Sequence, residues 1–425
     1  MLFHFTMKRF TMDYANLTPL WIAVFVDILG FSIILPFLPF FLNEFNTNPI
    51  IIGLLLSSNA IFGFFFGPIL GKLSDIYGRK PLLLISQAGT IAGFVLLMFA
   101  GNIQMLFIAR IVDGIFGGQF PISKAIIGDV VPPQDRPKQM TNIGVTFTLA
   151  FLIGPSLGGF LSYFGIAGPA FLASILASFT MIYTALFLKE TLPSKQVEKP
   201  MILLESNATK TNDNKSIPIY KNKNAMLLLV QYTFIVLAAG VFQGTFSLFG
   251  FLRLNLNEQL IGLLLTFMGI FQVIFRSIAF NKIRNYLGDP KTAMLGLASY
   301  IISYFLLGFV SELWQLVIIL FYISFSGATS RGITIGFTSR SVDFRNQGKI
   351  MGISSSLDNL SQIFGPIAGG ILLSLPNNTF YGIFLSLLSI IPFILSFRVL
   401  KFGYDSRSIV KEDINFSKIK RNPEI

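Results

Sequence analysis

Long apolar runs separated by short polar segments make up most of this sequence. About 20 apolar residues in a helix cross the roughly 30 Å hydrocarbon core of a bilayer, and twelve of the runs reach that length. We therefore expect an all-α membrane protein with twelve transmembrane helices. They are expected at about residues 17–43, 50–71, 80–100, 103–128, 140–162, 168–189, 224–251, 258–282, 291–310, 312–335, 347–374 and 379–400.

The basic residues predict how these helices are oriented. Most of the 32 Lys and Arg residues lie in the tails and in the loops after every second helix. The exceptions are Arg110, Lys124, Arg276 and Arg331 within helices and Arg253 in an opposite loop. Because basic loops stay in the cytoplasm, we expect a multi-pass protein of the cell (inner) membrane with both termini cytoplasmic.

A polar segment rich in Lys, Asn and Ser separates the first six helices from the last six. Such a composition is typical of a linker between two bundles. We expect a cytoplasmic tail over 1–16, a six-helix bundle over 17–189, a cytoplasmic linker over 190–223, a second bundle over 224–400 and a cytoplasmic tail over 401–425. No cleavable signal peptide is expected before the first helix.

An internal repeat supports two pseudo-symmetric halves. A Gly-Pro-x-x-Gly-Gly pattern occurs in helix 5 and again in helix 11, and its small residues would let helices approach closely. We expect the Gly-Pro step to break both helices, as in transporters built from repeated bundles. The residues are Gly154, Pro155, Gly158 and Gly159, and then Gly365, Pro366, Gly369 and Gly370.

The short polar connection between helices 2 and 3 carries a distinctive pattern, in which two glycines should let the backbone turn tightly. It resembles the signature loop of the major facilitator superfamily of transporters, and it departs from the family pattern at Ile76. The matching residues are Gly71, Asp75, Gly78, Arg79 and Lys80.

Four other stretches resemble motifs of the same superfamily. Arg110, followed by Gly114 four residues on, resembles its helix 4 motif, and the helix 5 repeat above resembles a motif associated with antiporters. The stretch that begins at Asp27 resembles helix 1 of twelve-helix drug/proton antiporters, and residues 128–136 are similar to tetracycline-efflux-type members. The resemblance implies a major facilitator fold and proton-coupled efflux of a small amphipathic compound.

Three carboxylates should lie near the membrane midplane, where charges are costly and usually functional. These are Asp27, Asp113 and Asp358, each roughly 15 Å into its helix at 1.5 Å per residue. Arg110 lies three residues before Asp113 on the same helix face and should pair with it. Arg276 joins this proton and substrate pathway as a cation in an otherwise apolar stretch. Arg276, Lys124 and Arg331 could instead extend to the interface. The Arg110–Asp113 pair could instead be a static buried ion pair, and Asp358 could instead make only a polar helix contact.

The carboxylates at the cytoplasmic ends of helices 2 and 4 suggest a gate. We expect Arg79 to bridge Asp75 and Asp129, because its planar group can bind two carboxylates at once. By resemblance, Asp75 would face the start of helix 11 near Gly348 when the cytoplasmic side is closed. Each contact near the interface is worth about 1 kcal/mol or less.

Other chemistry is not expected. The chain has no cysteine and a single histidine, His4, so thiolate metal sites and disulfides are excluded. Residues 67–73 lack the spacing and hydroxyl of a phosphate-binding loop. We expect no enzymatic activity, cofactor, metal site or nucleic-acid partner, although the net charge is +12. The expected partners are a small molecule, protons and the bilayer, and we expect a monomer.

Two alternatives to efflux remain open from the residues alone. The same scaffold serves proton-coupled uptake of a nutrient or siderophore, and a non-transporting receptor or sensor is the second possibility. Three midplane charges disfavour a sensor, which has no need of them. Phe31, Phe147 and Phe242 lie on helices expected to line the cavity, where they could bind a flat amphipathic substrate.

Overall fold

The computed structural model describes residues 17–40, 45, 47–132, 135–165, 167–192, 219–342, 344–377 and 379–401. These residues form helices and short connections, with no strand among them. The predicted tails and most of the predicted linker lie outside the described residues, so the exact domain limits stay predictions.

Six membrane spans form the first bundle. Three of them show a change of helix type or a break within the span, and the other three are single helices. In order they are α2 (Thr18–Ile34) continued by η1 (Leu35–Phe40), α4 (Pro49–Tyr77), α5 (Arg79–Met98), α6 (Ile103–Ile115) followed by α7 (Gln119–Val130), α8 (Arg136–Leu161) continued by η2 (Ser162–Phe164), and α9 (Ala167–Phe187).

Six further spans form the second bundle, which begins after the short η3 (Ile219–Lys221). They are α11 (Lys223–Leu254), α12 (Glu258–Ile274) with the π-helical turn η4 (Phe275–Ala279) and α13 (Phe280–Leu287), α14 (Asp289–Leu307), α15 (Leu313–Thr329) followed by α16 (Arg331–Arg340), α17 (Phe344–Leu373), and α18 (Thr379–Lys401). In the described part of the chain, eleven spans are both long and apolar enough to cross a membrane. The twelfth, α17, is long enough but carries more polar residues.

The expectation that Gly-Pro breaks helices 5 and 11 is wrong. Both α8 and α17 run without interruption through Pro155 and Pro366. Each proline removes only the hydrogen bond to the carbonyl four residues earlier, and neighbouring helices bind the same stretch through serine hydroxyls. The Oγ of Ser32 donates to the Ala150 carbonyl at 2.9 Å, and the Oγ of Ser57 donates to the Ile363 carbonyl at 2.7 Å.

The connection between α4 and α5 is also shorter than expected. Helix α4 continues through Gly71 and Asp75 to Tyr77, so Gly71 takes no part in the turn. Only Gly78 turns the chain, with a φ of 106° that glycine adopts without strain. Gly71 instead lies against Pro121 of α7, where a Cβ would stand 3.6 Å from the proline.

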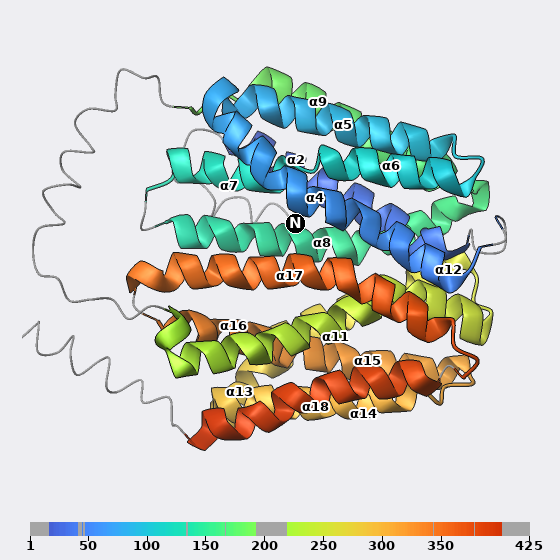
Figure 1. Ribbon diagram of the computed structural model, residues 1–425, viewed down its shortest axis with the longest axis vertical. Coiled ribbons are helices and arrows are strands. Elements are labelled where there is room, and N and C mark those ends of the chain that lie inside the picture. Colours follow the sequence, from blue (N-terminus) through green and yellow to red (C-terminus); the bar gives the residue numbers. More distant parts are fainter. Residues whose placement is uncertain are drawn as a thin grey trace, which may run out of the picture.

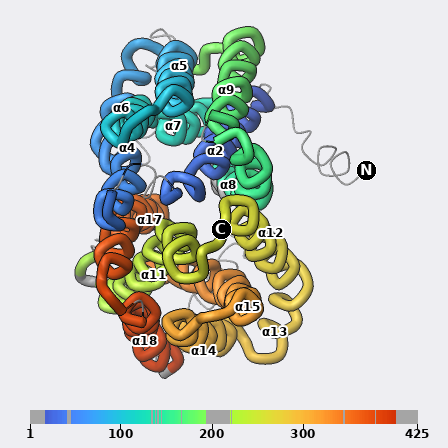
Figure 2. Tube along the Cα trace, turned by 90° about the vertical axis from the view of Figure 1, so that its right-hand side faces the viewer, coloured from blue at the N-terminus to red at the C-terminus, as the bar shows by residue number. Residues whose placement is uncertain are grey.

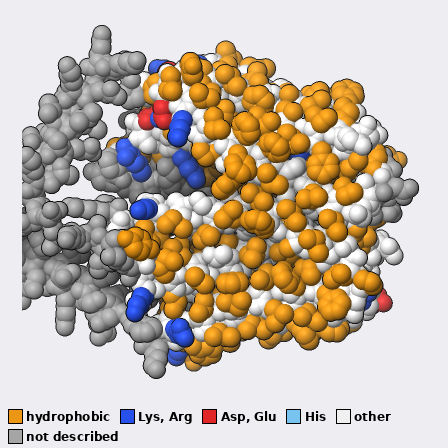
Figure 3. All heavy atoms as spheres, viewed as in Figure 1, with side chains coloured by type: hydrophobic (Ala, Val, Ile, Leu, Met, Phe, Trp, Pro, Cys, Tyr) orange, Lys and Arg blue, Asp and Glu red, His pale blue; other side chains and the backbone are white. Residues whose placement is uncertain are grey.

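Two bundles lie side by side along the long axis, with α4 and α8 of the first facing α17 and α12 of the second (Figures 1 and 2). We call the end of the molecule that carries Gly78 the turn end. Lys and Arg side chains gather there, and few reach the other end (Figure 3). This asymmetry agrees with the charge pattern of the loops, while the orientation in a membrane stays a prediction.

The bundles touch at the end opposite the turn end. A Cβ on Gly53 would overlap the backbone of Pro366, and a Cβ on Gly262 would lie 3.2 Å from Gly159. At the turn end, by contrast, Gly348 and Gly352 on α17 have open space around them. The structure therefore shows the two bundles closed at one end and apart at the other.

Candidate functional site

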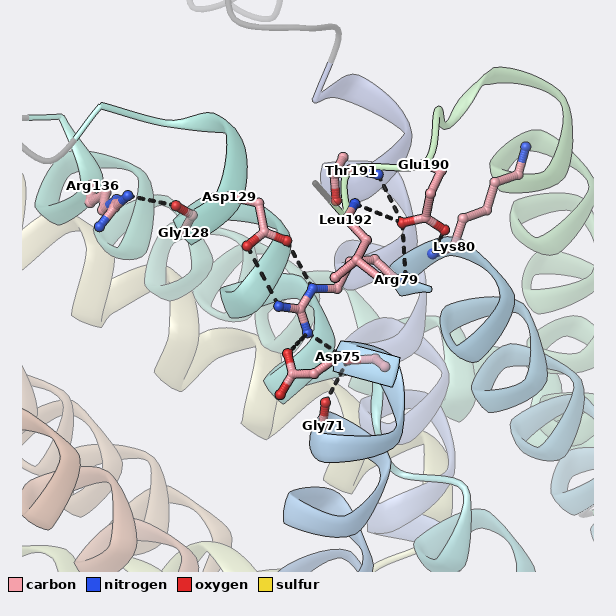
Figure 4. Close-up of polar contacts among 11 residues, drawn as sticks. Gly71, Asp75, Arg79, Lys80, Gly128, Asp129, Arg136, Glu190, Thr191 and Leu192 are labelled. Atoms are coloured by element: carbon pink, nitrogen blue, oxygen red, sulfur yellow. Dashed lines mark hydrogen bonds and ion pairs between the residues drawn. The ribbon is translucent and has the colours of Figure 1, made fainter. Parts of the chain in front are cut away.

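Arg79 forms the centre of a charged cluster at the turn end (Figure 4). Its guanidinium pairs with Asp75, contacts Asp129 at 2.8 Å through Nε, and donates to the Oγ of Ser74 at 2.8 Å. The Arg79 side chain is 9% exposed, whereas that of Asp75 is 57% exposed. The structure thus brings α4, α5 and α7 together through one side chain. Asp75 does not face the start of α17, because a Cβ on Gly348 would have no atom within 4 Å.

Glu190, just after α9, completes this cluster and was not predicted as a site residue. Its Oε1 accepts hydrogen bonds from the N–H groups of Arg79, Thr191 and Leu192, each at 2.9 Å, and its Oε2 accepts from Lys80 at 3.1 Å. Burial opposes ionisation, but these four donors outweigh it and hold the pKa of Glu190 below its usual value. Since the first N–H groups of a helix have no partner within it, Glu190 caps α5 from a distant part of the chain.

The remaining contacts of the cluster tie helix ends to one another. The Nζ of Lys80 donates to the Ala185 carbonyl at 2.7 Å, which links α5 to α9. Arg136 donates to the carbonyls of Gly128 at 2.6 Å and Val131 at 2.9 Å, at the end of α7. The Oγ of Ser74, which accepts from Arg79, donates in turn to the Gly71 carbonyl at 2.6 Å (Figure 4). All predicted gate residues therefore lie in or beside one contiguous network.

A second group of polar residues lies inside the first bundle, around Asp27 and Asp113. The amide Nε2 of Gln119 donates to Asp27 at 2.6 Å and lies 3.4 Å from the Oγ1 of Thr90. Asn59 donates to Asp113 at 2.8 Å. Asp27 borders a pocket with about 190 Å³ of empty space between α2, α5, α7 and α9.

Arg110 has an unusual environment. The side chain is 1% exposed, and among the described residues none of its guanidinium nitrogens has a hydrogen-bond partner. Its contacts are an ion pair with Asp113 at 3.5 Å and the face of the Phe94 ring at 6.0 Å. A buried cation with so few partners is costly, so the predicted Arg110–Asp113 pair exists, but it is a loose one.

Asp358 lies apart from the other two carboxylates, in the second bundle. It accepts hydrogen bonds from the phenol of Tyr232 at 2.9 and 3.0 Å and pairs with the Nη2 of Arg331 at 2.8 Å. Arg331 therefore binds a carboxylate rather than extending to the interface, and Tyr232 is a partner that the sequence analysis missed. Arg276 lies on the π-helical turn η4, exposed and beside Gly332.

Comparisons with known proteins identify the family of this arrangement. The sequence profile of the Major Facilitator Superfamily matches residues 20–254 and 233–424. The chain belongs to the major facilitator superfamily. It is therefore a membrane transporter rather than an enzyme, and the predicted fold of two six-helix bundles is confirmed.

Relatives in this superfamily include efflux proteins. The chain is 31% identical over 345 residues to the class H tetracycline resistance protein of Pasteurella multocida, covering 80% of this chain and 85% of that one. It is 25% identical over 355 residues to multidrug resistance protein 2 of Bacillus subtilis, covering 83% and 87%. The predicted resemblance to tetracycline-type members is confirmed at this level.

Solved major facilitator structures have the same fold at lower identity. The human organic anion transporter MFSD10 superposes with a TM-score of 0.63 at 21% identity, covering 89% of this chain and 98% of that one. A bacterial homologue of the human lysosomal transporter Spinster, in an inward-facing and unoccupied conformation, gives a TM-score of 0.69 at 15% identity and covers 92% and 98%.

Apart from Glu190, the site residues that the sequence did not reveal are neutral polar side chains. Asn59, Gln119 and Tyr232 carry no charge that would mark them as costly in a membrane. Gln119 follows two glycines at the break between α6 and α7, and that break is the one local signal that could have drawn attention to it. Within the described residues, no group of His, Cys, Asp and Glu is placed to bind a metal ion.

Proposed function

We propose that this chain exports a small amphipathic compound in exchange for protons by alternating access. The observation that carries the proposal is the pair of inner carboxylates, Asp27 and Asp113, of which only Asp113 has a cation beside it. A carboxylate within a membrane span and without a cation beside it is costly when ionised, and protonation removes that cost. The names of the tetracycline and multidrug resistance relatives support efflux as the direction.

The two carboxylates have different roles in this proposal. Asp27 takes up and releases the proton, since its partner is the neutral amide of Gln119. Asp113 acts through its ion pair with Arg110, because no guanidinium nitrogen of Arg110 has a hydrogen-bond partner in the described part of the chain. A proton that binds Asp113 removes the negative charge beside Arg110. This changes the free-energy cost of burying Arg110 and thereby favours one of the two bundle arrangements.

Transport in everted membrane vesicles tests the proposal, with tetracycline and ethidium as probes and an imposed proton gradient. Wild-type protein should accumulate at least one probe, and Asp27→Asn and Asp113→Asn should each reduce gradient-driven accumulation at least about tenfold. Asp135→Asn, which lies outside the membrane spans, is the matched control and should transport normally.

Two results would count against the proposal. Full gradient dependence in both inner variants would exclude these carboxylates from coupling. Gradient-driven movement of solutes into right-side-out vesicles, without export, would favour the uptake alternative. Membrane abundance of every variant is measured on the same vesicles, so that a loss of transport is not a loss of protein.

A further inference from the structure

The second bundle contains an aromatic pocket that the proton group of the first bundle does not use. It lies between α11, α12, α14 and α15, and its space of about 290 Å³ is partly open to solvent. Its lining includes Phe242, Gln243, Gln272, Tyr300 and Tyr304. An apolar, aromatic cavity with a few polar groups is the usual form of a small-molecule site.

The rings of this pocket form a continuous wall. Tyr300 and Tyr304 stack with their centroids 5.1 Å apart, and the Phe242 ring lies 5.6 Å from that of Tyr304. The Tyr300 hydroxyl and the Gln272 amide converge over Gly327, where a Cβ would lie 3.2 Å from one and 2.6 Å from the other. A side chain at residue 327 would therefore narrow the pocket.

Two of its amides are free to bind a ligand. The side chains of Gln243 and Gln272 have no hydrogen-bond partner among the described residues, and Gln243 is exposed. Free donors and acceptors on an aromatic wall suit a flat molecule with polar substituents.

The charges beside the pocket are mostly positive. Arg331 lies one helical turn after Gly327, whose Cβ would stand 3.2 Å from the Tyr300 hydroxyl, so its side chain starts close to the pocket wall. The Nη1 of Arg276 lies 3.5 Å from where a Cβ on Gly332 would stand. A second guanidinium therefore lies beside the residue that follows Arg331 in the chain. Lys124 of α7 is a further cation within a membrane span.

Only one carboxylate balances these cations. Asp358 pairs with Arg331, whose side chain is 46% exposed, while no ion pair to Arg276 or Lys124 occurs in the described residues. Unbalanced positive charge within membrane spans is costly, and an anion would reduce that cost. A π-helical turn such as the one that carries Arg276 is frequent at functional sites.

We propose that this pocket binds the apolar body of an amphipathic aromatic anion, and that Arg331, with Arg276 beside it, binds the acidic group of that anion in place of Asp358. The proposal rests on the proposed transport function and names its substrate class. While the site is empty, Asp358 takes the place of the ligand's acidic group at Arg331. When the anion binds, Tyr232 keeps its hydrogen bond to the carboxylate that Arg331 has released.

Equilibrium binding to the purified full-length chain in neutral lipid nanodiscs tests this assignment, with empty nanodiscs subtracted. The anionic probe is 1-anilinonaphthalene-8-sulfonate, and the cationic probe is tetraphenylphosphonium. We expect the anion to bind, Arg331→Gln to weaken it at least about tenfold, and Arg331→Lys to restore part of the affinity. Arg340→Gln, on the same helix and exposed, is the matched control and should bind as the wild type does.

Asp358→Asn gives the decisive result. Removing the carboxylate that competes for Arg331 should tighten anion binding about threefold or more, whereas a purely structural pair would lose affinity when either partner is removed. Weaker anion binding by Asp358→Asn, or a wild type that prefers the cation, would overturn the assignment.

This experiment uses no gradient, so its outcome is independent of coupling. Failure of anion binding with intact proton-driven transport of another probe would refute the substrate class alone. Normal anion binding in a chain that transports nothing under a gradient would refute the proposed function alone.

Discussion

Replacing Glu190 by alanine should loosen the start of α5 and separate it from the segment after α9. The carboxylate serves two N–H groups of α5 and two of its own segment. Loss of a helix-capping acceptor costs about 1 kcal/mol, within a range of about 0.5–2 kcal/mol. Because Glu190 is exposed, we expect about 1–2 kcal/mol for Glu190→Ala and about half of that for Glu190→Gln, which keeps one acceptor oxygen.

The pH dependence of this effect has a definite sign. A carboxylate whose folded pKa is lowered stabilises the folded state above its ordinary pKa, and this stabilisation is lost as the pH falls through the folded value. The stability difference between wild type and Glu190→Gln should therefore be full near neutral pH and should shrink as the pH falls below 4.5, the ordinary value for this group.

Thermal unfolding in nanodiscs, followed by the fluorescence of Trp21 and Trp314, measures both effects. About 2–4 °C per kcal/mol is typical of chains of 150–250 residues, and longer chains shift less. We expect Glu190→Ala to lower the midpoint by about 2–4 °C near neutral pH. Glu258→Gln, in the first turn of α12, is the control, because no hydrogen bond to its side chain occurs in the described residues.

Two outcomes would refute the reasoning about Glu190. An unchanged midpoint in Glu190→Ala would mean that water replaces the carboxylate without cost. A deficit in Glu190→Gln that stays the same down to acidic pH would mean that its charge plays no part.

Two further predictions concern the turn end. Asp75→Asn should widen the distance between spin labels at Tyr77 and Gly352, because Asp75 is expected to face the start of α17 near Gly348 only when the turn end is closed, and the closed arrangement then loses a contact worth about 1 kcal/mol or less; unchanged distances with transport lost would exclude a gating role. A single cysteine at Tyr286 should be protected from an impermeant thiol reagent in intact cells, and one at Ser311 should be labelled, because the chain has no other cysteine and basic loops stay in the cytoplasm. The reverse pattern would contradict the predicted orientation.

The sequence alone determined the number of membrane spans and the family. Each span must cover the bilayer whatever its neighbours are, so length and hydropathy suffice to locate it. The cluster around Arg79 was also predictable, because Asp75 lies four residues before it across the turn and Asp129 leaves the membrane at the same face. Arg110 and Asp113 were predictable as a pair for the same local reason.

Only the tertiary structure decided which distant side chains meet. Glu190 caps α5 from more than 100 residues away, and Tyr232 reaches Asp358 over a separation of 126 residues. Such contacts depend on how each helix is rotated about its axis, and an apolar span that meets both lipid and protein does not reveal that rotation. The contact between Ser32 and the Ala150 carbonyl of α8 has the same origin, since the hydroxyl comes from another helix.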